Sequence, residues 1–186
     1  MAAVQIAPVA LRAGIAAGTV YRYFPGKTDL VAALIGEIAE REIAVLRRAA
    51  AGAPGPLSAV AAAIATFAVR ALRHRRLAFA VIAEPIDAEL DAARLSFRQA
   101  VAGEFSSLIG AAVADKHLPE QDAALSAAAL LGLLVEGLIG PLAPDAAGHG
   151  REIVQSLTLL ALRALGVADA RARGLVVQTV NQSSKV

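Results

Sequence analysis

The stretch from Ala13 to Lys27 constrains the fold of this chain more than any other part of the sequence. Its residues are AGIAAGTVYRYFPGK. Gly14 supplies the conformation that a helix end and a tight turn require, and Ile15 is expected to re-enter the core before a second helix begins. Pro25 stops that second helix because proline cannot continue it. Two short helices joined by so tight a turn cross steeply, which indicates a helix-turn-helix unit.

The second helix of this unit has one apolar and one polar face. At 100° per residue, Val20 and Phe24 lie together and are expected to face the core. The opposite face is expected to consist of Gly18, Thr19 and Arg22, with Tyr21 and Tyr23 on its two flanks. Such a face suits a DNA major groove, because Arg22 can reach base edges while the phenols reach phosphates. Gly26 and Lys27 begin the next helix, where backbone amides and an ammonium group form a phosphate site.

The same stretch, followed by Thr28-Asp29-Leu30, strongly resembles the TetR/AcrR family of transcriptional regulators. The resemblance covers roughly residues 5 to 35 and includes the pattern Gly-Thr-Val-Tyr-x-Tyr-Phe-x-x-Lys. It implies an all-helical homodimer whose N-terminal head binds an operator and whose larger body binds a small ligand. By position, the family's phosphate contacts fall on Thr19, Tyr21, Tyr23 and Lys27. Positions that vary with the operator sequence fall on Ala17, Gly18 and Arg22.

The chain departs from the family at its start. The head of the family has three helices, and the first would lie before residue 1 here. Gln5 stands where the family usually has a capping Thr or Ser, and Pro8 falls in the first turn of the remaining helix. The sequence leaves open whether the chain is truncated or the protein lacks a complete head. A two-helix head is expected to expose the apolar side of Val9, Leu11, Ile15 and Phe24.

Composition favours an all-α fold, and the resemblance implies a truncated helix-turn-helix head joined to a helical ligand-binding and dimerisation body. Apolar residues make up 57% of the chain, aromatics only 4%, and no long stretch alternates with period two. The expected divisions are a head with its linking helix at 1–50, a body at 51–177 and a disordered tail at 178–186. The loop Ala51 to Leu57 is the clearest boundary.

The body is expected to contain a series of amphipathic helices. The signals that delimit them are a long helix from Thr28 to Ala51, a cap at Ser58, a short helix from Leu77 to Ala83, a cap at Asp87, an opening at Pro119, and helices at Arg151 to Leu165 and Asp169 to Val177. The basic run from Arg70 to Arg76 has two interpretations. It is either an auxiliary contact to DNA or an anionic ligand, or a set of cations at a solvated helix end.

Residues 119–165 are the expected homodimer interface. The segment Ala123 to Val135 is apolar on all sides, so protein is expected on every face of its helix. Leu160, on the last main helix, is expected to face inward. A membrane span needs about 20 apolar residues, and Glu136 with Gly140-Pro141 interrupts this run too early. Two such helices from each subunit form a four-helix interface.

Charge and residue usage narrow the class of protein. The net charge is +2, and before Asp29 the chain carries Arg12, Arg22 and Lys27 but no acid, so the head is locally basic. The absence of cysteine excludes disulfides and fits a cytoplasmic protein, and no secretory signal is visible. The three histidines lie on different elements and no catalytic motif is present, so we expect no enzyme, metal site or cofactor.

Ligand sensing is the expected role of the body. Phe67, Phe79, Phe97 and Phe105 come from three successive helices and either line one apolar cavity or form ordinary core. Glu84 or Arg98 is a candidate to orient a polar end of the ligand. The favoured function is a repressor that binds a palindromic operator in double-stranded DNA as a dimer and is released by a small-molecule effector. The alternatives are a dimeric small-molecule binding protein without DNA binding, and a membrane-associated or scaffold protein.

Overall fold

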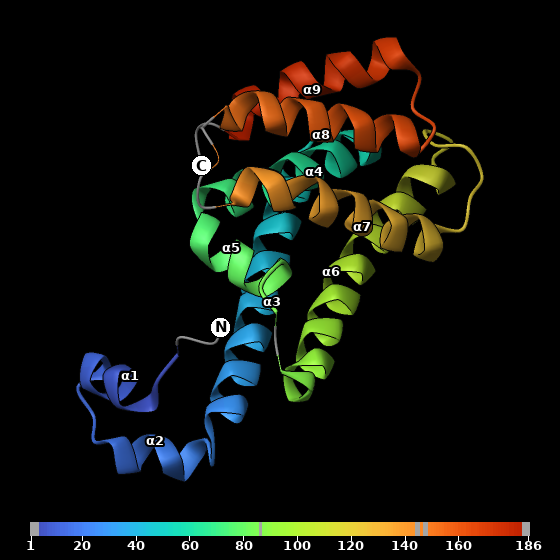
Figure 1. The fold of residues 1–186 in the computed structure, drawn as a ribbon. Coiled ribbons are helices and arrows are strands. Elements are labelled where there is room, and N and C mark those ends of the chain that lie inside the picture. The colour runs from blue at the N-terminus through green and yellow to red at the C-terminus, as the bar shows by residue number, and fades with distance from the viewer. Residues whose placement is uncertain (1–3, 86, 144–145, 147–148, 184–186) are drawn as a thin grey trace.

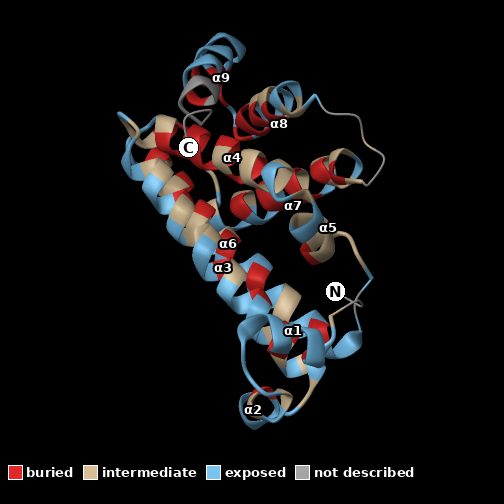
Figure 2. Ribbon diagram, turned by 90° about the vertical axis from the view of Figure 1, so that its left-hand side faces the viewer, coloured by how far each residue is buried: buried red, intermediate tan, exposed pale blue. Residues whose placement is uncertain are grey.

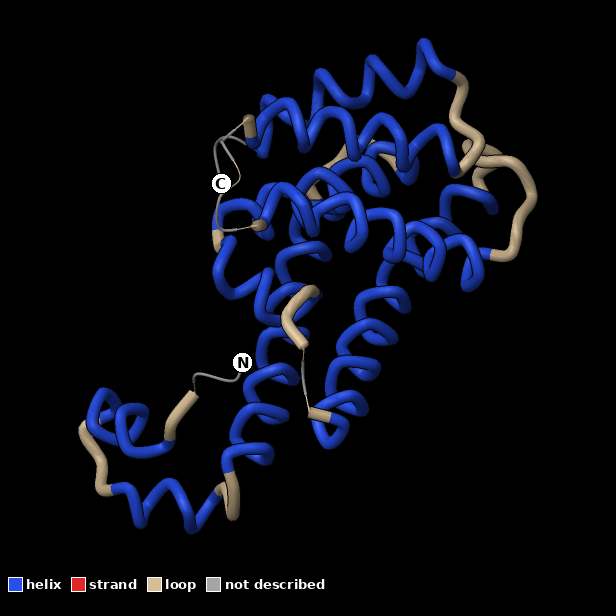
Figure 3. Tube along the Cα trace, in the orientation of Figure 1, coloured by secondary structure: helices blue, strands red, loops and turns tan. Residues whose placement is uncertain are grey.

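The structure, a computed structural model, describes residues 4–85, 87–143, 146 and 149–183. Every regular element within these residues is a helix (Figures 1 and 3), which confirms the predicted all-α fold. The helices are α1 (Ile6–Ala13), α2 (Ala17–Tyr23), α3 (Lys27–Ala51), α4 (Pro56–Arg73), α5 (Arg75–Ile82), α6 (Ala88–Ala114), α7 (Ala123–Leu142), α8 (Gly150–Ala164) and α9 (Asp169–Ser183).

The helices form a small head and a larger body that share α3. Helices α1 and α2 lie at one end of the molecule, and α3 runs from them into the body (Figure 1). In the body α3 packs against α4 and α6, while α4 also contacts α7, α8 and α9. Buried residues are concentrated around α4, where these helices meet (Figure 2). Helix α4 is therefore the centre of the body core.

Helix α3 is a long amphipathic helix, as the sequence predicts. At its start the Gly26 amide donates a hydrogen bond to the Asp29 carboxylate, with N and Oδ2 2.9 Å apart. Val31, Ile35 and Leu46 are fully buried along one stripe, which fixes the helix to the body over most of its length. The helix is continuous, so a tilt of its body end carries through to the head.

Two helix starts differ from the prediction. Helix α4 begins at Pro56 after Gly55, so the predicted cap at Ser58 is wrong; proline takes the first helical position, where its missing amide costs nothing. Helix α7 begins at Ala123 rather than near Pro119. The Asp122 carboxylate caps it by accepting hydrogen bonds from the amides of residues 124 and 125, at 2.9 and 3.0 Å.

The basic run after residue 70 is split between two structural roles. Arg75 begins α5 and its Nη2 donates hydrogen bonds to the carbonyls of Pro141, Ala143 and Ala146, at 2.8, 3.0 and 3.1 Å. It thereby binds the C-terminal end of α7, where helix carbonyls lack partners. Arg70 is paired with a carboxylate of α3, as described below. Neither arginine fits the expectation of a solvated helix end, whereas Arg73, His74 and Arg76 are exposed as that expectation has it.

Within one chain, helix α7 is buried on one face only, so the prediction of protein on every face depends on a second copy of the chain. The helix continues through Pro141 to Leu142. Its buried side faces α6 and α8, and the opposite side is exposed, with Leu125 69% exposed. Leu160 on α8 is likewise 52% exposed rather than inward. Helical periodicity shows that a helix is apolar all round, but it does not show how many sides are covered within one chain.

The last helix extends further than the sequence analysis expects. Helix α9 runs from Asp169 to Ser183 rather than ending at Val177, while residues 184–186 lie outside the described part of the chain. Thr179 is buried, and its hydroxyl donates a hydrogen bond to the Leu175 carbonyl at 2.9 Å. A polar residue can therefore continue the helix by bonding back to the preceding turn.

Two helices, α4 and α7, are long and apolar enough to cross a membrane by length and composition alone. For α4 the composition reflects its central position, because it is surrounded by α3, α6, α7, α8 and α9. Core helices of this kind are apolar on most sides.

Candidate DNA-binding head and effector cavity

The head is a two-helix unit held by a small apolar core. Helix α1 ends at Gly14, whose φ of 69° is left-handed, and the amide of residue 15 bonds the Ala10 carbonyl at 3.0 Å. This is the tight turn that the sequence predicts. Ile6, Ala10 and Val20 are buried and form the head core, with Ala17, Phe24 and Leu30 packed at its edge. Leu30 belongs to α3, so the head core is attached to the first turn of that helix.

The predicted contact face of α2 is exposed. Tyr21, Arg22 and Tyr23 are all exposed, and the Arg22 guanidinium carbon lies 5.3 Å from the Tyr23 ring centroid. Gly18 is exposed with open space around its Cα, whereas Thr19 is half-buried. The structure therefore brings a guanidinium, two phenols and a hydroxyl onto one short helix, with a glycine that admits close approach.

Two predicted contact positions differ in their surroundings. Ala17 is half-buried against the head core, so its backbone rather than its methyl group is offered to a partner. Lys27 is exposed at the start of α3. The neighbouring Gly26 amide is occupied by Asp29, so it is not the free donor that the sequence suggests.

The far side of the head exposes apolar residues. Val9, Leu11 and Ile15 are 38%, 83% and 45% exposed, and Phe24 is half-buried. The exposure of the first three agrees with the expectation for a two-helix head. It also contradicts the placement of Ile15 in the core, because no described segment covers the outer side of the turn.

A cavity of about 290 Å³ that opens to solvent lies in the body among α3, α4, α5 and α6. Its walls are mainly apolar, with charged groups at one side. The lining residues are Leu34, Glu37, Ile38, Arg41, Glu42, Phe67, Arg70, Ala71, His74, Leu77, Ala78, Val81, Ile82 and Phe97. Five of these fourteen residues belong to α3, so the helix that carries the head also forms a wall of the cavity.

Two of the predicted ligand residues line this cavity and four do not. Phe67 and Phe97 are in its wall. Phe105 is fully buried behind Phe67, with ring centroids 6.3 Å apart in an edge-to-face arrangement, so it acts as core. Phe79 and Glu84 are half-buried outside the lining.

The fourth residue outside the lining, Arg98, is exposed on α6. Nearby, Arg94 stabilises the bend between α5 and α6 by donating a hydrogen bond from Nη2 to the Glu84 carbonyl at 2.6 Å. Burial lowers the pKa of this arginine from its usual range. Glu84 therefore serves the bend through its backbone, and its side chain does not reach the cavity lining.

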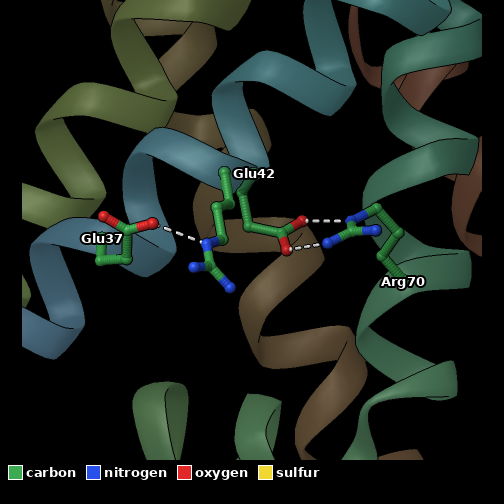
Figure 4. A network of polar contacts seen from close by, with 4 residues as sticks. Glu37, Glu42 and Arg70 are labelled. Carbon is green, nitrogen blue, oxygen red and sulfur yellow. Dashed lines mark hydrogen bonds and ion pairs between the residues drawn. The ribbon is translucent and has the colours of Figure 1, made fainter.

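The polar side of the cavity is built from residues that the sequence does not reveal. Arg70 on α4 forms a two-pronged ion pair with Glu42 on α3, with Nε–Oε2 and Nη2–Oε1 distances of 2.8 and 2.6 Å (Figure 4). The hydrogen-bonded carboxylate raises the pKa of Arg70, and burial partly opposes this shift. On the same wall Arg41 donates to Glu37 at 2.7 Å. The Glu37–Arg41 spacing of four is visible in the sequence, but the interhelical pair is not.

A second cavity of about 460 Å³ lies on the other side of Arg70, among α3, α4 and α9. Arg48, Arg73, Thr66 and Thr179 contribute its polar groups. Arg70 borders both cavities, and its carboxylate partner lines only the first. The first cavity therefore combines apolar walls with a paired donor and acceptor.

The fold and the head together define an all-helical helix-turn-helix protein. Residues 1–34 match the family model described as bacterial regulatory proteins, tetR family. No curated protein sequence matches the chain. The predicted resemblance of the head to the TetR/AcrR family is confirmed over these residues.

Solved structures show the same fold over nearly the whole chain. RolR without ligand is 20% identical with a TM-score of 0.72, covering 94% of this chain and 86% of that one. RolR in complex with resorcinol is 20% identical with a TM-score of 0.66, covering 94% and 83%. A TetR/AcrR regulator from Thermobifida fusca YX-ER1 is 21% identical with a TM-score of 0.65, covering 86% of each chain. These likenesses show that the chain has the same all-helical fold.

Proposed function

We propose that the protein is a cytoplasmic repressor that binds a palindromic operator as a homodimer and is released by a small molecule in the cavity of about 290 Å³. The continuity of α3 is the observation that carries this proposal. Leu30, in its first turn, packs in the head core, and Leu34, Ile38 and Glu42 line the cavity. A change in the cavity wall is therefore transmitted along one rigid helix to the head.

The exposed face of α2 supports DNA binding. Arg22 is the residue that reads base edges, since a guanidinium can form two hydrogen bonds with guanine. Thr19, Tyr21, Tyr23 and Lys27 contact phosphates, and Ala17 and Gly18 allow the helix backbone to approach the groove. The match of residues 1–34 to the tetR family supports this assignment.

Exposed positions on α7 and α8 support the dimer. Those of α7 recur with helical spacing and consist mainly of small or apolar residues: Leu125, Ala128, Ala129, Glu136 and Gly140. On α8 the exposed positions Ser156, Leu160 and Arg163 include one large apolar side chain. Exposed apolar side chains that lie close together mark protein interfaces. Packed against their copies, these helices form a four-helix interface.

Close packing within the chain places the exposed positions of the two helices together. A Cβ atom at Gly137 would lie 2.5 Å from Leu157 Cδ2, so glycine lets α8 approach α7 closely. These positions therefore form one surface within residues 119–165. In a dimer built on this surface, rotation of α3 changes the separation of the two recognition helices, and a palindromic site can no longer hold both.

A dimeric small-molecule binding protein without DNA binding is the second candidate. The observation that favours it is the exposure of Val9, Leu11 and Ile15 on the far side of the head. A head whose apolar side is incompletely covered can lose rigidity. Arg22 then loses its fixed placement on α2. The body, its cavity and the dimer surface are the same in both proposals.

DNA binding distinguishes the two candidates. The full chain is titrated into a labelled fragment from upstream of its own coding sequence, and binding is followed by fluorescence anisotropy at several salt concentrations. The repressor proposal requires binding that weakens steeply with salt, because phosphate contacts release counterions. Absence of binding even at low salt overturns it and leaves the second candidate.

A further inference from the structure

We propose that the cavity among α3, α4, α5 and α6 selects an uncharged, largely apolar molecule of one or two rings that donates a hydrogen bond to Glu42. Binding then competes with the Glu42–Arg70 ion pair that joins α3 to α4. This inference rests on the proposed function, because α3 is the helix that carries the head. It names the chemical class of the effector and the contact through which the effector acts.

The size and walls of the cavity limit the ligand. Its volume of about 290 Å³ is at the lower end of the ~300–1,000 Å³ typical of ligand pockets. The apolar wall includes Phe67, Phe97, Val81 and Ile38, which come from four different helices. A ring of modest size is therefore in contact with apolar groups on several sides. Long chains and large polycyclic molecules do not fit.

The charges around the cavity favour an uncharged ligand. The lining contains two carboxylates, Glu37 and Glu42, and two guanidinium groups, Arg41 and Arg70, and each is already paired. A carboxylate ligand that took Arg70 would leave Glu42 without its partner, and a cationic ligand that took Glu42 would leave Arg70 alone. Leaving a partly buried charge unpaired is costly, so both kinds of ion are disfavoured.

The hydrogen-bonding groups favour a donor on the ligand. Both Nε and Nη2 of Arg70 are directed at Glu42, so these donors are occupied. An ionised carboxylate has about four lone-pair sites, and the two bonds from Arg70 use two of them. The Glu42 side chain is 18% exposed and lines the cavity, so a hydroxyl or ring N–H can reach its remaining sites.

The same contact provides the link to the head. Glu42 is on α3 and Arg70 is on α4, and this ion pair is partly buried, unlike the exposed Glu37–Arg41 pair on the same wall. A donor that shares the Glu42 carboxylate weakens its hold on Arg70. The ligand therefore binds better to the arrangement of α3 in which the Glu42–Arg70 contact is weaker. Its binding shifts the population of molecules toward that arrangement and away from the DNA-binding one.

The test uses three probes with the same two-ring skeleton. These are 2-naphthol, which is neutral and donates a hydrogen bond, 2-methoxynaphthalene, which is neutral without a donor, and 2-naphthoate, an anion. Binding to the full chain is measured by isothermal titration calorimetry at neutral pH. We expect 2-naphthol to bind about tenfold or more tightly than either of the others, in line with a hydrogen bond to a charged group. Equal binding, or a preference for naphthoate, overturns the proposal.

Matched variants identify the residue responsible. Glu42→Gln keeps the shape but removes the charge, and we expect it to weaken 2-naphthol binding about tenfold while leaving 2-methoxynaphthalene unchanged. Glu104→Gln is the control, because Glu104 also pairs with α3, through Arg47 at 2.8 Å, but does not line the cavity. Equal effects of the two variants overturn the assignment to Glu42.

A variant that fills the cavity and a measurement of DNA affinity separate a failure of the ligand proposal from a failure of the proposed function. Ala78→Leu narrows the cavity and should abolish binding of all three probes, which locates the site even if Glu42→Gln fails to fold. 2-Naphthol should reduce DNA affinity of the natural protein by at least several-fold and have less effect on Glu42→Gln. If the protein binds DNA but the three probes bind in a different order of affinity, only the proposed ligand class is overturned. If the probes bind in the expected order but the protein does not bind DNA, only the proposed function is overturned.

Discussion

The Arg22 guanidinium carbon lies 5.3 Å from the centroid of the Tyr23 ring, on the exposed face of α2. Cation–π contacts at exposed sites contribute about 0.5–1 kcal/mol, too little to hold a helix but enough to favour one orientation of a long side chain. The contact favours the position in which the Arg22 guanidinium carbon lies over the Tyr23 ring.

This placement predicts that Arg22→Ala selectively weakens operator binding. The loss should be about 1–3 kcal/mol, or roughly ten- to a hundredfold, because one pair of base-edge hydrogen bonds disappears. Thermal stability should stay unchanged, since the side chain is exposed. Anisotropy titrations with the operator and with a scrambled duplex of equal length measure the effect. Arg98→Ala, which removes an exposed charge on α6, is the control, and an equal loss on both duplexes contradicts a role in base reading.

Lys27 should behave differently from Arg22. Its ammonium group is exposed at the N-terminal end of α3, where it suits a phosphate rather than a base. Lys27→Ala should weaken binding to specific and scrambled duplexes by similar factors and reduce the slope of log K against log salt by about 1. The same titrations repeated over a series of salt concentrations provide the slope. An unchanged slope would mean that Lys27 makes no phosphate contact.

The sequence predicts the head well because its signals are local. The left-handed Gly14, the stop at Pro25 and the exposed positions of α2 all follow from residues within one or two turns. Residues 1–34, which contain this motif, also match the tetR family model. Ile15 is the exception, because its exposure depends on whether another segment covers it, and local spacing carries no information about that.

The cavity could be predicted only in part, because its polar side depends on distant pairs. Phe67 and Phe97 were recognisable as aromatics on inner helix faces, but Phe105 is core and Phe79 lies outside the lining. The Glu42–Arg70 pair spans 28 residues of sequence, and only the packing of α3 on α4 brings its members together. Arg75 likewise finds its carbonyl partners 66 or more residues away, so composition alone suggested a solvated charge.

Phe105 should be the most sensitive of the aromatic positions to truncation. Its side chain is fully buried, and its ring packs edge-to-face against Phe67. Phe105→Ala should lower the free energy of unfolding by about 3–5 kcal/mol, because it removes a large apolar contact and leaves a cavity. Phe79→Ala, at a half-buried position, should cost clearly less. Urea unfolding at one fixed protein concentration compares them, and equal losses contradict the assignment of Phe105 to the core.

Two glycines should respond to alanine in opposite directions. Gly166 has a φ of 89°, and a Cβ atom there would lie 2.7 Å from Pro119 Cγ, in a ring that cannot rotate away. Gly166→Ala should therefore destabilise the protein by about 1–3 kcal/mol. Gly36 lies inside α3 with open space around it, so Gly36→Ala should stabilise by about 0.5–1 kcal/mol. Thermal melts of both variants test the pair, and a stabilising Gly166→Ala contradicts the placement of the turn against Pro119.

The exposed positions of α7 and α8 predict that a single charge disrupts the homodimer. Leu160 is 52% exposed on α8, and burying its side chain against a second copy contributes about 1.5–3 kcal/mol. Leu160→Glu replaces that contact with a carboxylate that loses water on association, so it should shift the protein toward monomer by well over tenfold in dissociation constant. Sedimentation velocity over a range of concentrations measures the shift, and circular dichroism checks that the helices remain.

Leu95→Glu provides the matched control for this last prediction. Leu95 is 56% exposed, slightly more than Leu160, but it lies on α6, outside the proposed interface at residues 119–165. It should leave the oligomeric state unchanged. The monomeric Leu160→Glu variant should also lose most of its affinity for a palindromic operator while keeping weak binding to a half-site, because only one recognition helix is then available per complex. A Leu160→Glu variant that remains dimeric while Leu95→Glu dissociates would place the interface on α6 instead.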